Sequence, residues 1–85
     1  MHNDLIFRKG ETTFQFRIDE NANIKWRSWV DGDNPNEAFV WRIFILGEKD
    51  SREIERIIRS GIDSSRFSER DKKKVVKWYL SAKNF

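Results

Sequence analysis

Hydrophobic and polar residues alternate with a period of two through residues 4–30, and two short segments interrupt the alternation. In the middle of this region Phe14, Phe16 and Ile18 alternate with polar side chains. Such alternation is typical of strands that bury one face, and the interrupting residues are turn formers. The pattern therefore predicts three antiparallel strands, at about 4–9, 12–18 and 24–30, with turns at Lys9-Gly10 and Asp19–Asn23.

A nearly continuous apolar run, Ala38–Leu46, follows a loop of turn formers at 31–36 and is broken only by Arg42. Continuous apolar runs are typical of strands that are buried on both faces. We therefore expect the fourth strand at about 38–46, in the interior of the sheet with a neighbour on each side. This strand would pair with the third one as a second hairpin.

From Asp50 onward the spacing of the apolar residues becomes that of helices. Asp50 and Ser68 are suited to cap helix N-termini, because each is followed three residues later by an acidic side chain. Gly61 is expected to end the first helix. The spacing predicts two amphipathic helices, at about 51–60 and 69–83, with Ile54, Ile57 and Ile58 on the apolar side of the first and Val75, Val76, Tyr79, Leu80 and Ala82 on that of the second.

The order of these elements predicts an α+β fold, in which a four-stranded antiparallel sheet of two consecutive hairpins is followed by two helices that pack on one face of it. A chain of 85 residues has room for a single domain, 1–85. Four Trp, seven Phe and one Tyr can form its core without disulfides, since the sequence has no cysteine. Without an apolar leader or a run long enough to span a membrane, the sequence favours a cytoplasmic protein that does not bind membranes.

The residues of common catalytic sites are missing from the sequence. The one histidine, His2, lies next to the N-terminus, so a Ser/His/Asp or Cys/His system would have no base. The four glycines are scattered and form no phosphate-binding loop. We therefore expect no enzyme, no catalytic residue and no cofactor. A nuclease that works through Lys, Arg, Glu and Tyr79 is a minor alternative, because Tyr79 is already explained by the apolar side of its helix.

The loop at 31–37 contains five side chains with oxygen atoms that could bind calcium. Its spacing differs from that of an EF-hand, because Pro35 takes the place of the third ligand and the glycine position does not match. We interpret the segment as a hairpin loop and expect no metal site.

Positive charge is concentrated in the C-terminal part of the chain. The net charge is +3, but residues 1–50 carry 7 Lys and Arg against 9 Asp and Glu, whereas residues 51–85 carry 10 against 5. A ridge of cations can bind a phosphate backbone with release of counterions, although Lys and Arg also merely solvate helices. We predict that helical cations contact phosphates: Arg52, Arg56 and Arg59 on the first helix, Arg66 before the second, and Arg70, Lys73, Lys74 and Lys77 on the second, with Lys72 in the same cluster.

A second candidate surface lies on the sheet. If the phenylalanines of the second strand face the core, the period of two puts Arg17, Lys25, Arg27 and Trp29 on the opposite face, where we also place Arg42 and Phe44. Single-strand readers stack bases on rings and hold the backbone with cations, so Arg27 and Trp29 are predicted to stack on or clamp bases. Alternatively, the cations protect the strands from aggregation, or the rings anchor a protein interface or a homodimer. An edge strand could serve the same interface.

In its size, its Lys- and Arg-rich composition without cysteine and its order of strands before helices, the chain resembles the small early proteins that tailed phages use against host defences. It resembles in particular the RNA-binding phage inhibitors of type III toxin–antitoxin endoribonucleases. This resemblance covers the whole chain without matched positions, so it assigns no residue. It implies an RNA-binding inhibitor that acts in the host cytoplasm on a host nuclease or toxin.

We therefore predict a small, basic, non-enzymatic RNA-binding protein that inhibits a host defence system such as a toxin–antitoxin endoribonuclease. Its ligand would be single-stranded or structured RNA, bound with low sequence specificity. The alternative is a protein-binding inhibitor or antitoxin-like module that acts through the sheet face or a sheet edge without nucleic acid.

Overall fold

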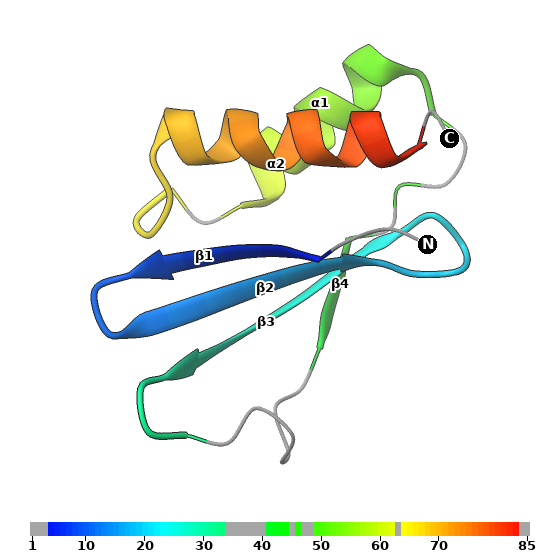
Figure 1. Ribbon diagram of the computed structural model, residues 1–85. Helices are drawn as coiled ribbons and strands as arrows, with labels where there is room; N and C mark the ends of the chain where they lie inside the picture. Colours follow the sequence, from blue (N-terminus) through cyan, green and yellow to red (C-terminus); the bar gives the residue numbers. More distant parts are fainter. Residues whose placement is uncertain (1–3, 34–40, 45, 47–48, 63, 84–85) are drawn as a thin grey trace. The chain divides into compact units, whose positions relative to one another are not determined.

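The computed structural model describes residues 4–33, 41–44, 46, 49–62 and 64–83. Four strands form one antiparallel sheet and two helices follow, so the predicted α+β order of elements is confirmed (Figure 1). The chain divides into two compact units, Met1–Ile45 with the sheet and Leu46–Phe85 with the helices, and each is described by itself. Packing of the helices on one face of the sheet, and a single domain over 1–85, stay predictions.

The first three strands lie where the alternation predicts them. They are β1 (Leu5–Lys9), β2 (Thr12–Ile18) and β3 (Ile24–Val30), and β2 pairs antiparallel with both of the others. The β1–β2 turn uses Gly10 at a φ of 63°, a left-handed conformation that glycine adopts without steric cost. The β2–β3 turn is held by Asp19, whose Oδ1 accepts hydrogen bonds from the backbone N–H groups of Asn21 and Asn23, both at 2.9 Å.

The fourth strand differs from the prediction. β4 comprises Arg42–Phe44, and residues 38–40 and 45 of the expected strand lie outside the described residues. Within the described sheet β4 is an edge strand that pairs with β3, not an interior strand with two neighbours. Arg42 and Ile43 are exposed. Leu46 at the end of the run is buried, but the apolar run did not mean an interior strand, because the run alone does not show which strands pair.

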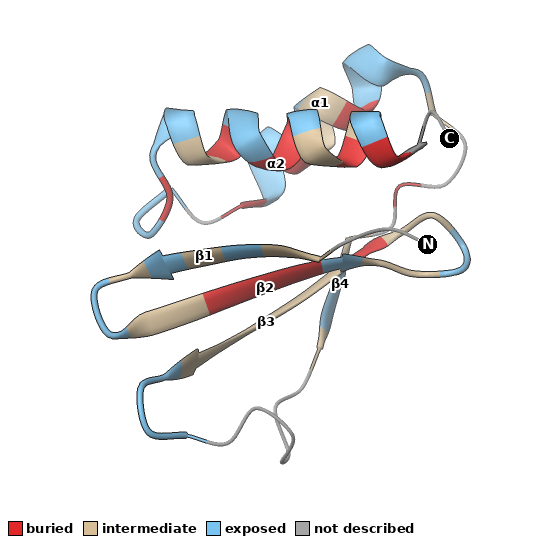
Figure 2. Ribbon diagram, in the orientation of Figure 1, coloured by how far each residue is buried: buried red, intermediate tan, exposed pale blue. Residues whose placement is uncertain are grey.

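The two faces of the sheet differ in character, since residues paired directly across an antiparallel ladder project from the same face. Phe14 and Phe16 of β2 and Ile24 of β3 are buried (Figure 2). Their face also carries Phe7 and Trp26: the Phe16 ring meets Phe7 edge-on and stacks on Trp26, with centroid distances of 6.0 and 6.1 Å. We call this the apolar face and the opposite one the polar face.

The helix α1 (Ser51–Gly61) begins as the sequence predicts. Asp50 is its N-cap, and Asp50 Oδ1 accepts a hydrogen bond of 2.9 Å from the backbone N–H of Glu53. Its end differs by one residue, because Gly61 belongs to the helix and Ile62 is the C-cap. Ile54 and Ile58 are fully buried, as the apolar stripe predicts.

The helix α2 (Glu69–Lys83) begins with a reciprocal cap. The backbone N–H of Asp71 donates to Ser68 Oγ at 3.3 Å, and the backbone N–H of Ser68 donates to Asp71 Oδ2 at 3.1 Å. The predicted apolar side of this helix is buried at four of its positions: Val75, Val76, Tyr79 and Ala82.

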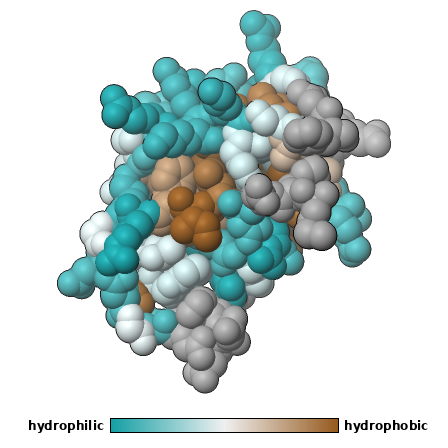
Figure 3. Space-filling model, viewed as in Figure 1, coloured by the Kyte–Doolittle hydropathy of each residue, from teal (hydrophilic) through white to brown (hydrophobic). Residues whose placement is uncertain are grey.

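Hydrophilic residues cover most of the coloured surface in the view of Figure 3, in keeping with a mean hydropathy of −0.80. Neither of the two helices in the described part of the chain is long and apolar enough to cross a membrane.

Candidate nucleic-acid interface

The candidate residues on the polar face of the sheet come from β2, β3 and the segment at β4. Arg17 pairs with Lys25, and Gln15 pairs with Arg27, so these four side chains project together. Trp29 follows Arg27 by two positions on β3 and therefore shares the face. The structure thus brings Arg27 and Trp29 together, with the guanidinium carbon 5.5 Å from the centre of the Trp29 ring.

Three cations converge on a residue that the sequence prediction did not include, Trp41. The guanidinium carbons of Arg17 and Arg27 lie 5.2 and 4.5 Å from the centre of its ring, and Lys25 Nζ lies 5.0 Å from it. These distances lie within the range of attractive cation–π contacts. We call Arg17, Lys25, Arg27 and Trp41 the Trp41 cluster. Trp41 is half-buried, so part of its side chain remains accessible.

A hydrogen-bond network holds two of these cations in place. Asp4 accepts hydrogen bonds from Arg17 Nη2 at 2.7 Å and from Gln15 Nε2 at 2.6 Å. Gln15, which is only 7% exposed, in turn accepts a hydrogen bond of 2.8 Å from Arg27 Nε. The hydrogen bond from Arg17 lowers the pKa of Asp4, and the same bond raises the pKa of Arg17. The cluster is therefore preorganised, and the carboxylate of Asp4 is hydrogen-bonded within its network.

Arg42 and Phe44 are not part of the polar face, contrary to the prediction. Lys25 pairs with Ile43, whereas Arg42 pairs with Trp26 and Phe44 pairs with Ile24 on the apolar face. The Arg42 guanidinium carbon accordingly lies 5.3 Å from the centre of the Trp26 ring. The error has a simple cause: a shift of one residue in register exchanges the two faces of a strand. With the correct register, the alternation along 41–44 would have placed Trp41 on the polar face.

The predicted cations of α1 lie in a shallow groove together with acidic residues. Arg52, Arg56 and Arg59 line an open groove of about 530 Å³, which Glu55 and Glu69 also line. Arg59 is ion-paired with both carboxylates, at 3.7 Å from Glu55 Oε1 and 2.5 Å from Glu69 Oε2. The hydrogen bond from Arg59 lowers the pKa of Glu69. Much of the charge of Arg59 is therefore offset within the helical unit.

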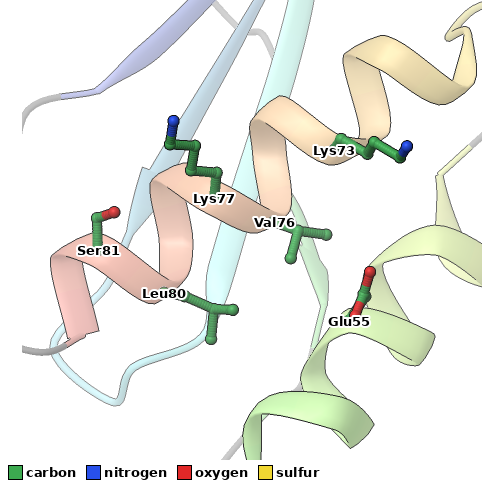
Figure 4. Close-up of a pocket in the computed structure, with 6 residues that line it drawn as sticks. All are labelled: Glu55, Lys73, Val76, Lys77, Leu80 and Ser81. Atoms are coloured by element: carbon green, nitrogen blue, oxygen red, sulfur yellow. The ribbon is translucent and has the colours of Figure 1, made fainter.

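Arg70, Lys73, Lys74 and Lys77 of α2 are exposed, and two of these predicted cations line a second groove. Lys73 and Lys77 flank this groove of about 350 Å³, with Val76 and Leu80 at its apolar base (Figure 4). Glu55 reaches toward it from α1, whereas Lys77 extends away from Glu55 (Figure 4). Carboxylates thus lie between the basic residues of the two helices.

The remaining helical cations differ in their surroundings. Arg66, Arg70 and Lys74 are exposed. Lys72 is not, contrary to its place in the predicted basic cluster: the residue is 5% exposed, and its Nζ donates a hydrogen bond of 2.6 Å to Ser64 Oγ. Within the described part of the chain, no ion pair is formed by the other exposed cations of α1 and α2 that we predicted: Arg52, Arg56, Arg70, Lys73 and Lys77.

Two separate groups of candidate residues result. The Trp41 cluster and Trp29 belong to the sheet unit, and the helical cations belong to the helical unit. Residues 34–37 of the acidic loop lie outside the described residues, and the ranges that are described contain no group of three or more His, Asp or Glu side chains able to hold a metal ion. Comparisons with protein-family models, with curated proteins and with solved structures gave no match for this chain.

Proposed function

We propose that the protein binds RNA through the polar face of its sheet and does so without enzymatic activity. The observation that carries this proposal is the convergence of Arg17, Lys25 and Arg27 on the ring of Trp41. Cations held this close repel one another, and Asp4 accepts a hydrogen bond from Arg17, which offsets part of that repulsion. A polyanion that approaches this face relieves the repulsion and releases its own counterions.

The helical cations extend the proposal. Lys73, Lys77, Arg52 and Arg56 are exposed and form no ion pair with another described residue, so they are available to phosphates of an RNA. Arg59 is expected to contribute less to RNA binding, because it is already ion-paired with Glu55 and Glu69. The resemblance to phage anti-defence proteins adds a setting to the proposal, in which a joint protein–RNA complex inhibits a host endoribonuclease.

The salt dependence of RNA binding tests the role of the Trp41 cluster. We expect the Kd for a labelled single-stranded RNA of about 12 nucleotides to rise steeply between about 50 and 200 mM salt. Lys25→Gln should reduce the slope of log Kobs against log salt by about one, because one phosphate contact is lost. Fluorescence anisotropy of the RNA gives both quantities.

Arg8→Gln is the matched control. Arg8 pairs with Thr13, which places it on the polar face, and it is ion-paired with Asp31. The variant loses the same unit of charge as Lys25→Gln but no cation of the cluster, so its slope should stay near that of the wild type. Equal effects of the two substitutions would contradict the assignment of the Trp41 cluster, and wild-type protein that does not bind RNA would contradict the proposed function.

A protein-binding function is the second candidate, and the exposed apolar residues of the polar face favour it. Ile6 on β1 is 56% exposed and Ile43 on β4 is 58% exposed, and both strands are edges of the described sheet. An apolar side chain on an exposed edge strand is suited to pairing with another chain. Nuclease treatment before a pull-down separates the two functions, because an RNA-dependent partnership would vanish and a direct protein contact would persist.

A further inference from the structure

We infer that the ligand on the polar face is unpaired RNA, held by stacking of a base on Trp41 while the surrounding cations hold the backbone. This inference rests on the proposed function and deepens it. Binding to the cations alone would accept any polyanion, whereas binding to the ring requires a base with an exposed face. A duplex keeps its bases stacked inside, so it offers phosphates but no such face.

The placement of Trp41 supports a stacking role. Its ring is fixed over β2 and β3 by the three cations at 4.5 to 5.2 Å, so its position on the face costs little further ordering when a ligand binds. Trp41 is not among the buried core residues, although the fold buries other large aromatic side chains completely. An indole that is held in place and only half-buried has the properties of a stacking platform.

The cations near the Trp41 ring are suited to bind the phosphate of a nucleotide whose base stacks on the ring. Arg17 and Lys25 are directly opposite one another on β2 and β3. Arg27 lies two residues after Lys25 on β3, and its Nε donates a hydrogen bond to Gln15. The positive groups therefore lie over the ring, within 4.5 to 5.2 Å of its centre. A base on Trp41 would leave its phosphates next to guanidinium and ammonium groups, which gives the face charge complementarity to a single strand.

A second ring extends the platform. The Arg27 guanidinium carbon lies 4.5 Å from the centre of the Trp41 ring and 5.5 Å from that of Trp29, so Arg27 contacts both indoles. A single-stranded RNA that crosses β3 could place one base on the Trp41 ring and one on the Trp29 ring, with Arg27 between them. The ligand is thus a short run of unpaired nucleotides, read by stacking rather than by base-edge hydrogen bonds, which agrees with low sequence specificity.

The test compares three RNA-type ligands of equal length on the wild-type protein by fluorescence anisotropy: a single strand, a blunt duplex, and a stable analogue that keeps the phosphate backbone but has no bases. The single strand should bind best, and loss of the bases should weaken binding by at least the effect of one stacked base, about 5- to 150-fold. Simple electrostatics predicts the reverse order for the duplex, because its charge density is higher.

Two variants of one residue complete the test. Trp41→Leu removes the aromatic face, and should weaken binding of the single strand by a similar factor while leaving the weak duplex binding unchanged. Trp41→Phe keeps an aromatic face, so its affinity for the single strand should fall less than that of Trp41→Leu. Circular dichroism checks that both variants are folded, and if Trp41→Leu is not, the ligand comparison on the wild-type protein decides.

The outcomes separate this inference from the proposed function. If duplex and base-free backbone bind as tightly as the single strand, or Trp41→Leu binds it like the wild type, stacking is overturned and RNA binding stands. If no ligand binds, both are overturned. Preference for the single strand together with a loss in Trp41→Leu supports both.

Discussion

Asp4 has more influence on the candidate site than its position near the N-terminus suggests. It accepts hydrogen bonds from Arg17 and Gln15, and through Gln15 it is connected to Arg27. Asp4 thereby holds the two arginines that contact Trp41, Arg17 directly and Arg27 through Gln15. No pattern in the sequence shows this role, because the residues that Asp4 joins are 11 to 13 positions away.

The lowered pKa of Asp4 predicts a loss of stability in acid. A carboxyl whose pKa is lower in the folded state contributes stability above its unfolded pKa, near 3.8, and that contribution disappears as the pH falls through the folded value. We expect the free energy of unfolding to fall below about pH 4, and Asp4→Asn to be destabilised at pH 6 but to approach the wild type at pH 2 to 3. Urea unfolding at these pH values measures the difference. A destabilisation that is independent of pH would show that the charge of Asp4 is not involved.

Trp41 shows a limit of sequence reading at this scale. The period of two predicted Arg27 and Trp29 on one face, because both lie inside a long regular strand. Trp41 precedes a strand of three residues, and its place depends on how that strand pairs.

At the scale of the elements, the two helices were predicted nearly to the residue. Their starts depend on side chains that bind backbone N–H groups three residues later, so the signal is local in sequence. The long strands were equally well predicted, since alternation over seven residues leaves one arrangement of faces. β4 was not, because an apolar run does not reveal whether its strand is interior or at an edge.

The N-cap of α1 gives a stability prediction. Asp50→Ala removes the acceptor of the Glu53 N–H and should lower the free energy of unfolding by about 0.5 to 2 kcal/mol. Asp50→Asn keeps an acceptor and should lose less, because Asn caps helices about as well as Asp. Urea denaturation of the three proteins measures both effects. Equal losses in the two variants would mean that the charge, and not the hydrogen bond, stabilises this end of the helix.

At the scale of the whole molecule, the question is whether the sheet and helical cations bind the same RNA. If they do, Lys73→Gln/Lys77→Gln should reduce the salt slope by about two, and adding Lys25→Gln should reduce it by about three. The two lysines are suitable because they are exposed and form no ion pair within the described residues. The measurement is the anisotropy titration used for Lys25→Gln. An unchanged slope in the double variant would show that Lys73 and Lys77 do not contact the RNA, and the proposed site would then consist of the sheet residues.

The alternation, the turn residues and the helix caps determined the type, the order and nearly all the bounds of the elements from the sequence by itself, because each of these signals acts over a few residues. The concentration of cations in the helical part was also evident, but not the carboxylates that lie among them in the folded helices. Only the tertiary structure decided that Trp41 joins Arg17, Lys25 and Arg27, and that Arg42 and Phe44 do not. The reason is physical: the pairing of β4 with β3 sets the register, and a change of one residue in that register moves every side chain of the strand to the other face.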